Sequence, residues 1–162
     1  MASGSELERF HTAQDEPEHG YRNALAEIRG TGKRSHWIWY VFPQLAGLGH
    51  SAPARRFALV GRAEAQAYLE DPLLRSRLLE ISSAVAHQLE RGHRLLDIMG
   101  SPIDVQKLVS SLTLFAQLSR ELRATAGGAE HEALANVAER VLTAAAEQGY
   151  PRCAFTQRAL AE

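Results

Sequence analysis

The chain has 162 residues, of which 45% are hydrophobic and 23% are charged, and its formal net charge at pH 7 is −1. This length predicts one domain, and the charge balance predicts no general attraction to nucleic acid or to a membrane surface. Cys153 is the only cysteine, so no internal disulfide can form. A lone cysteine and an amino terminus without a secretory signal favour a cytoplasmic protein.

The first part of the chain predicts short helices. Ser5-Glu6-Leu7-Glu8 has the form of a capping box and opens a helix that must end before Pro17. Residues 21–29 place apolar side chains on one stripe, and Gly30 ends that helix. Residues 36–42 would be apolar on both faces of a strand, so we interpret them as a helical turn capped by Ser35.

Two further short helices and one long helix follow. Ser51 with Pro53 begins the first, and residues 64–69 form the second. Asp71-Pro72 combines a capping residue with a proline at the first helical position, which is typical of a helix start. The apolar ladder that follows predicts a long helix that ends at Gly92.

The last third of the chain predicts two long helices. Ser101-Pro102 starts the first of them in the same way as Asp71-Pro72, and Gly127-Gly128 separates it from the second. Thr156 is expected to cap a last turn, whereas residues 95–99 fit either a strand or a helix. The fold class is therefore an all-α, irregular helical bundle. We expect one helical domain over residues 5–162, preceded by a disordered amino terminus at residues 1–4.

Only two of the 18 basic residues are lysines, Lys33 and Lys107. A lysine ammonium is a compact three-donor cation that arginine does not replace in a small site. Both lysines lie in the two most unusual segments, residues 33–44 and 101–115. We therefore expect that two distant segments build one site and that both ammonium groups face one hollow floored by indole rings.

The first of these segments is rich in aromatic residues. One interpretation is a core hub, because four large rings within six residues bury a large apolar area. The other is a pocket in which rings stack on a base and cations meet a phosphate. His36 is either a core histidine or a general acid or base. The candidate ligand-binding residues of this segment are Lys33, His36, Trp37, Trp39 and Gln44.

The second segment places Asp104, Lys107 and Ser111 on one stripe of a helix that is otherwise apolar. A buried lysine needs an anionic partner, and the structural interpretation assigns Asp104 to Lys107. The alternative is that Lys107, Ser110 and Ser111 line the ligand site. Histidine, cysteine and glycine spacings match no metal or dinucleotide motif, so no metal and no cofactor are expected.

Several blocks of the sequence resemble a bacterial family known as domain of unknown function eighteen-ten. They include Ser35-His36-Trp37, Phe42-Pro43-Gln44, Lys107-Leu108 with Ser110-Ser111, and Thr113-Leu114-Phe115. The resemblance implies a compact helical domain without an agreed activity. The segment around Cys153 departs from the family pattern, because an acidic residue usually lies near that position.

The layout is also similar to N-glycosyl hydrolases that act on NAD and ADP-ribose. That similarity implies Glu64 or Asp104 as the carboxylate that stabilises an oxocarbenium-like ribose, and His36, as an acid or base near neutral pH, is a further catalytic candidate. The leading hypothesis is thus binding of a small anionic, nucleotide-like ligand of the ADP-ribose or NAD type, with N-glycosyl hydrolysis as a further step. The alternative is a non-catalytic structural or interaction module, in a homodimer.

Overall fold

The computed structural model describes residues 4–30 and 32–162, and the side chains of all of these except Gly4 and Ser5. These residues form ten α-helices and no strand, which confirms the all-α expectation. The helices are α1 (Gly4–Gln14), α2 (Tyr21–Arg29), α3 (Ile38–Val41), α4 (Ala52–Arg56), α5 (Gly61–Glu70), α6 (Pro72–Glu90), α7 (Leu95–Met99), α8 (Pro102–Leu122), α9 (Gly128–Glu147) and α10 (Ala154–Ala161). Of the expected disorder at residues 1–4, residues 1–3 lie outside the described part, and α1 begins at Gly4.

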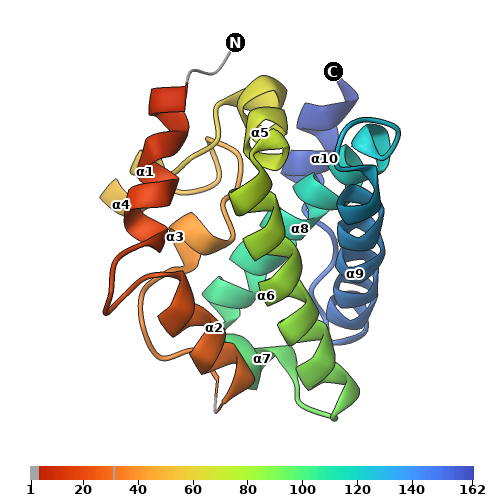
Figure 1. The fold of residues 1–162 in the computed structure, drawn as a ribbon. Helices are drawn as coiled ribbons and strands as arrows, with labels where there is room; N and C mark the ends of the chain where they lie inside the picture. The colour runs from red at the N-terminus through yellow and green to blue at the C-terminus, as the bar shows by residue number, and fades with distance from the viewer. Residues whose placement is uncertain (1–3, 31) are drawn as a thin grey trace.

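Helix α8 forms the centre of the fold. It packs against α3, α5, α7, α9 and α10, and α6 packs against α2 and α9 (Figure 1). Most of its side chains, from Val105 to Leu122, are buried, as expected for a helix that is apolar almost all round. Gln106 is exposed and Lys107 is half-buried, so this side of α8 reaches the surface, as do its two ends.

The start signals of the long helices are confirmed. The Asp71 carboxylate accepts hydrogen bonds from the backbone N–H of Leu73 and Leu74, both at 3.0 Å. The Ser101 hydroxyl accepts from Asp104 N at 3.2 Å. Gly127 is the residue before α9, with a φ of 83° that favours glycine.

Two predicted caps are wrong. Ser35 does not cap α3, because its hydroxyl donates to Glu27 and Trp37 takes the cap position. Thr156 lies inside α10, and Cys153 precedes that helix. The open choice at residues 95–99 resolves to a helix, α7.

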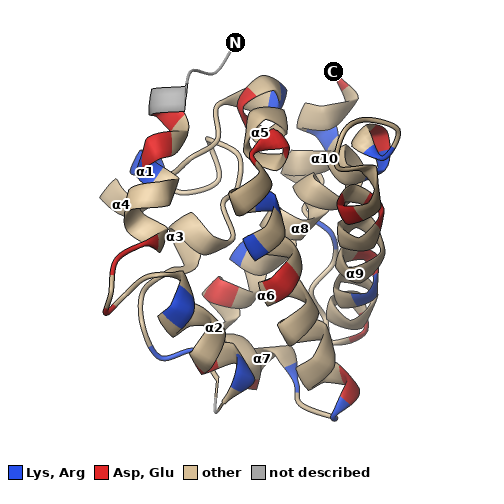
Figure 2. Ribbon diagram, in the orientation of Figure 1, with Lys and Arg blue, Asp and Glu red and all other residues tan. Residues whose placement is uncertain are grey.

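Charge is spread over the whole molecule. In Figure 2, acidic and basic positions alternate over the helices, and this view shows no face of one sign. None of the described helices is both long and apolar enough to cross a membrane.

Candidate functional site

Glu27, on α2, organises the segment that leads into α3. Its carboxylate accepts hydrogen bonds from the backbone N–H of Arg34 (2.7 Å) and Ser35 (3.0 Å) and from Trp37 Nε1 (3.0 Å). It also accepts from the Ser35 hydroxyl at 2.6 Å and from Asn23 Nδ2 at 2.8 Å. Burial raises the pKa of Glu27, but these hydrogen bonds outweigh it and lower that pKa to about 2. Glu27 is therefore ionised and fixes the aromatic segment.

Lys33 is buried against Trp37 and paired with α8. Its Nζ lies 2.8 Å from Asp104 Oδ2 and 5.0 Å from the centre of the Trp37 ring, and its side chain is 5% exposed. Trp37 itself is fully buried. Asp104 therefore neutralises Lys33 and not Lys107, so the partner expected from helical spacing is wrong. We call Lys33 and Trp37 the buried pair.

Lys107 and Trp39 form a second cation–ring contact that reaches the surface. Lys107 Nζ lies 4.9 Å from the Trp39 ring centre, and His36 stacks on the same ring at 6.4 Å. Within the described residues, no carboxylate pairs with Lys107, and the buried Trp39 Nε1 has no acceptor. We call Lys107 and Trp39 the surface pair. Together with Gln44 they line a hollow of only about 10 Å³, which has room for about one water molecule.

A larger hollow of about 280 Å³ lies on the neighbouring part of α8. We call it the α8 hollow; its polar lining comes from Gln106, Ser110, Tyr150 and Cys153. Ser110 lies about one helical turn from Lys107, since a rise of 1.5 Å per residue separates them by about 4.5 Å along the axis. The surface pair and the α8 hollow therefore share the exposed side of α8.

The loop after α3 and the start of α10 meet beside this side of α8. A Cβ atom built on Gly47 would lie 2.9 Å from the Phe155 ring, so the loop reaches α10 because this residue is glycine. Burial raises the pKa of the Cys153 thiol. Hydrogen bonds from the side chains of Thr156 and Ser110, and from backbone N–H groups of α10, outweigh the burial and lower that pKa.

The remaining candidates lie apart from the α8 hollow or are engaged elsewhere. The Ser111 hydroxyl is fully buried and has no hydrogen-bond partner. Glu64 Oε1 accepts from Arg9 Nη2 at 2.8 Å and from Val60 N at 3.1 Å. Each carboxylate proposed for glycosyl hydrolysis is thus held by its own cation, Glu64 by Arg9 and Asp104 by Lys33.

The structure brings together part of the predicted site. Lys107, Trp39 and Gln44 line the small hollow, and His36 stacks on Trp39. Ser110 lines the α8 hollow instead, and the side chains of Lys33 and Trp37 are buried. Each lysine covers its own indole ring, and the two ammonium groups do not line one hollow. Over residues 4–30 and 32–162, no three side chains of histidine, cysteine, aspartate or glutamate are placed to hold a metal ion.

Sequence reasoning missed Glu27 and Tyr150. Glu27 lies in the last turn of the helix at residues 21–29, where the helix dipole disfavours a carboxylate. An acidic residue in the last turn of a helix therefore indicates that specific hydrogen-bond donors stabilise its carboxylate. Tyr150 follows a predicted helix end and belongs to no motif or apolar stripe that would indicate a site.

Fold and site define a compact helical domain with a partly open hollow on α8, about one helical turn from Lys107. The chain belongs to the family described as protein of unknown function (DUF1810), whose model matches residues 4–142. Its structure is similar to the conserved hypothetical protein Rv1873 from Mycobacterium tuberculosis, with a TM-score of 0.72, 37% identity and 97% of each chain covered. No curated protein matches the chain. The segment with Tyr150 and Cys153 lies beyond the family match.

Proposed function

We propose that this protein binds a small anionic, nucleotide-like ligand in the α8 hollow, with the anionic group directed toward the surface pair. The observation that carries the proposal is the concentration of donors without acceptors. Lys107 Nζ has no carboxylate partner among the described residues, and Trp39 Nε1 is buried without an acceptor. An unpaired buried donor such as Trp39 Nε1 is costly, whereas Lys107 keeps contact with water and can pair with a phosphate oxygen.

The size of the α8 hollow favours a small ligand. Its volume of about 280 Å³ lies just below the range of about 300–1,000 Å³ that is typical of small-molecule sites. A mononucleotide or a sugar phosphate suits this volume better than a dinucleotide such as NAD. Tyr150 offers a ring for stacking, because Trp37 is buried and Trp39 already contacts His36 and Lys107.

The contacts of Glu64 and Asp104 do not favour cleavage of an N-glycosidic bond. N-glycosyl hydrolysis needs a carboxylate that can approach the ribose and stabilise an oxocarbenium-like transition state. Glu64 and Asp104 are each held in an ion pair, at 2.8 Å in both cases. We therefore propose a binding protein. A free thiol beside the α8 hollow fits a reducing, cytoplasmic compartment.

A thermal-shift titration tests the proposal. We expect AMP and ribose 5-phosphate to stabilise the protein saturably, by about 2.7 kcal/mol at a ligand concentration 100 times the dissociation constant. Adenosine, which lacks the phosphate, should have little effect. Lys107→Ala should abolish the response, whereas Arg22→Ala, which removes an exposed cation from α2, should keep it.

A flat response to all three compounds would contradict the proposal. It would favour the alternative, a non-catalytic interaction module. That alternative assigns the exposed side chains to a homodimer contact. It therefore predicts that the molar mass measured by sedimentation rises from that of a monomer to that of a dimer as the protein concentration increases.

A further inference from the structure

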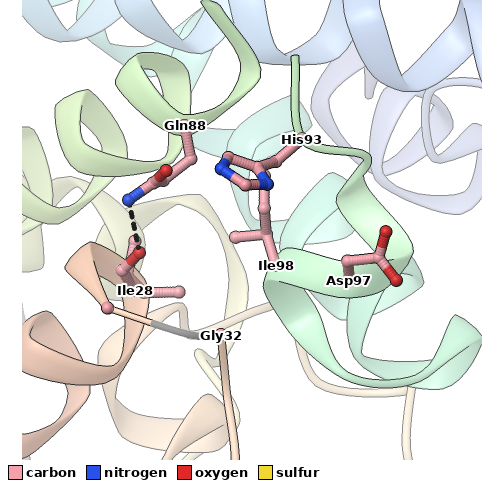
Figure 3. A pocket seen from close by; sticks show the side chains of 7 residues that line it. Ile28, Gly32, Gln88, His93, Asp97 and Ile98 are labelled. Atoms are coloured by element: carbon pink, nitrogen blue, oxygen red, sulfur yellow. Dashed lines mark hydrogen bonds between the residues drawn. The ribbon is translucent and has the colours of Figure 1, made fainter. Parts of the chain in front are cut away.

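A second cavity, of about 60 Å³, lies between the end of α2 and the turn from α6 to α7, away from the α8 hollow (Figure 3). Its walls come from Ile28 and Gly30 at the end of α2, Gln88 on α6, and His93 and Asp97 around the turn. At about 10–15 Å³ for each water-sized position, it has room for about four such positions. That volume suits a small polar head group.

Gln88 presents an unsatisfied acceptor at this cavity. Its side chain is buried, with 4% exposed, and its Nε2 donates to the carbonyl oxygens of Ile28 (3.1 Å) and Arg29 (3.0 Å). These two carbonyls fix the orientation of the amide, because an oxygen in place of Nε2 would face two acceptors. Among the residues that the structure describes, Gln88 Oε1 is consequently buried without a donor. The cavity therefore calls for a ligand that donates hydrogen bonds.

The charge around the cavity also favours a hydrogen-bond donor, and a cation in particular. No lysine or arginine is among its lining residues, and Asp97 lies at its rim with an exposed carboxylate that points away from Gln88 and His93 in Figure 3. The carboxyl-terminal end of α2, where the helix dipole favours cations, forms one wall. In Figure 3 the Gln88 amide and the His93 ring face each other, so the cavity also has a flat aromatic side.

The wall beside Asp97 is held in place by backbone contacts. Gly32 has a φ of 104°, and a Cβ atom there would lie 2.4 Å from the Asp97 carbonyl oxygen. Lys33 N donates to Ile98 O at 2.8 Å, which ties the same loop to α7. The cavity is therefore a built feature of the fold.

We propose that this cavity binds a guanidinium group. Guanidinium is a planar, donor-only cation whose fork of N–H groups pairs with carboxylates and amide oxygens and whose faces stack on rings. Its edge would donate to Gln88 Oε1, its face would lie against the His93 ring, and the exposed Asp97 side chain would turn toward its charge. A primary ammonium carries no planar face and uses only part of this arrangement.

Nuclear magnetic resonance titrations of the full-length protein test this site. We expect methylguanidine to shift the Gln88 side-chain amide and the Gly32 N–H saturably, and methylammonium to shift them much less. Asp97→Asn should weaken binding by about two- to fivefold, as expected for an exposed ion pair. Glu90→Gln, which removes an exposed carboxylate elsewhere on α6, should leave the affinity unchanged.

The source of the guanidinium is tested in the same way. Tighter binding of a blocked Ala-Arg-Ala peptide than of methylguanidine would identify an arginine side chain of a protein partner. Equal or weaker binding of the peptide would identify a free small molecule. Absence of saturable shifts would overturn the proposal and leave a water-filled cavity. Equal shifts with methylammonium would also overturn it, because they would show a cation site without preference for guanidinium. Because AMP binding depends on Lys107, the two sites fail or succeed independently.

Discussion

The buried pair and the surface pair contain the same two residue types in opposite environments. Lys33 lies over Trp37 with 5% of its side chain exposed, and Asp104 neutralises it. Trp37 Nε1 donates to Glu27. Lys107 lies over Trp39 at nearly the same distance, but no anionic partner of its ammonium or of Trp39 Nε1 occurs in the described part of the chain. The difference indicates a structural role for the first pair and supports the binding role proposed for the second.

This difference follows from the cost of burying polar groups. A buried cation is tolerated only with a partner, so the fold supplies Asp104 to Lys33 and Glu27 to Trp37. Lys107 keeps contact with water, so it needs no internal partner and can offer its charge to a ligand. Stability measurements should therefore respond to the buried pair, and binding measurements to the surface pair.

The largest effect on stability is expected from Lys33→Ala. It leaves the Asp104 carboxylate, which is 17% exposed, without its cation, at a cost of about 3 kcal/mol, the lower end of the range for buried ion pairs. Denaturant unfolding measures this loss. Replacing both partners, as Lys33→Met with Asp104→Leu, should recover most of it, because no unpaired charge is left. A loss below about 1 kcal/mol for Lys33→Ala would contradict a structural role for the buried pair.

Glu27→Gln should have the next largest effect, about 2 kcal/mol, because hydrogen bonds to a charged acceptor are replaced by weaker ones. The pKa of Glu27 is lowered from 4.5 to about 2 in the folded protein. Its contribution is therefore full above pH 4.5 and is lost as the pH falls toward 2. Unfolding curves across this range should show a smaller acid loss for Glu27→Gln than for the unchanged protein. Parallel curves would contradict the assignment.

Lys107→Ala should barely change stability while it removes ligand binding. An exposed cation–ring contact contributes only about 0.5–1 kcal/mol. Parallel measurements of unfolding and of AMP binding separate the two effects. A loss of several kcal/mol would instead place Lys107 with the buried pair.

The smallest effect is expected from Trp39→Phe. This change keeps a ring beneath Lys107 and removes the buried donor that lacks an acceptor. Stability should stay within about 1 kcal/mol, and AMP affinity should fall about fivefold, as expected for one lost hydrogen bond. Isothermal titration of both proteins provides the comparison, and an unchanged affinity would exclude Trp39 Nε1 from the site.

The fold was largely predictable because its signals are local. Asp71 and Ser101 predict helix starts, because their side chains cap the helix and a proline follows each of them. The cap assigned to Ser35 was wrong for a long-range reason, since Glu27 on another helix takes its hydroxyl. Which acceptor a serine hydroxyl bonds to depends on the folded structure and cannot be predicted from sequence spacing.

The site was predictable only in part, for the same reason. The scarcity of lysine and the four aromatic rings within residues 37–42 pointed to Lys107 and Trp39. Which lysine pairs with Asp104, however, depends on how α8 packs on the segment before α3. Asp104 was assigned to Lys107, one turn away on α8, and instead pairs with Lys33. Tyr150 contributes to the α8 hollow through the fold alone.

Calorimetric titration of AMP into three proteins tests the central claim most directly: the unchanged chain, Lys107→Ala, and the double variant Lys33→Met with Asp104→Leu. The account predicts equal saturable binding to the unchanged chain and to the folded double variant, and none to Lys107→Ala. Binding that survives in Lys107→Ala but disappears in the folded double variant would contradict it.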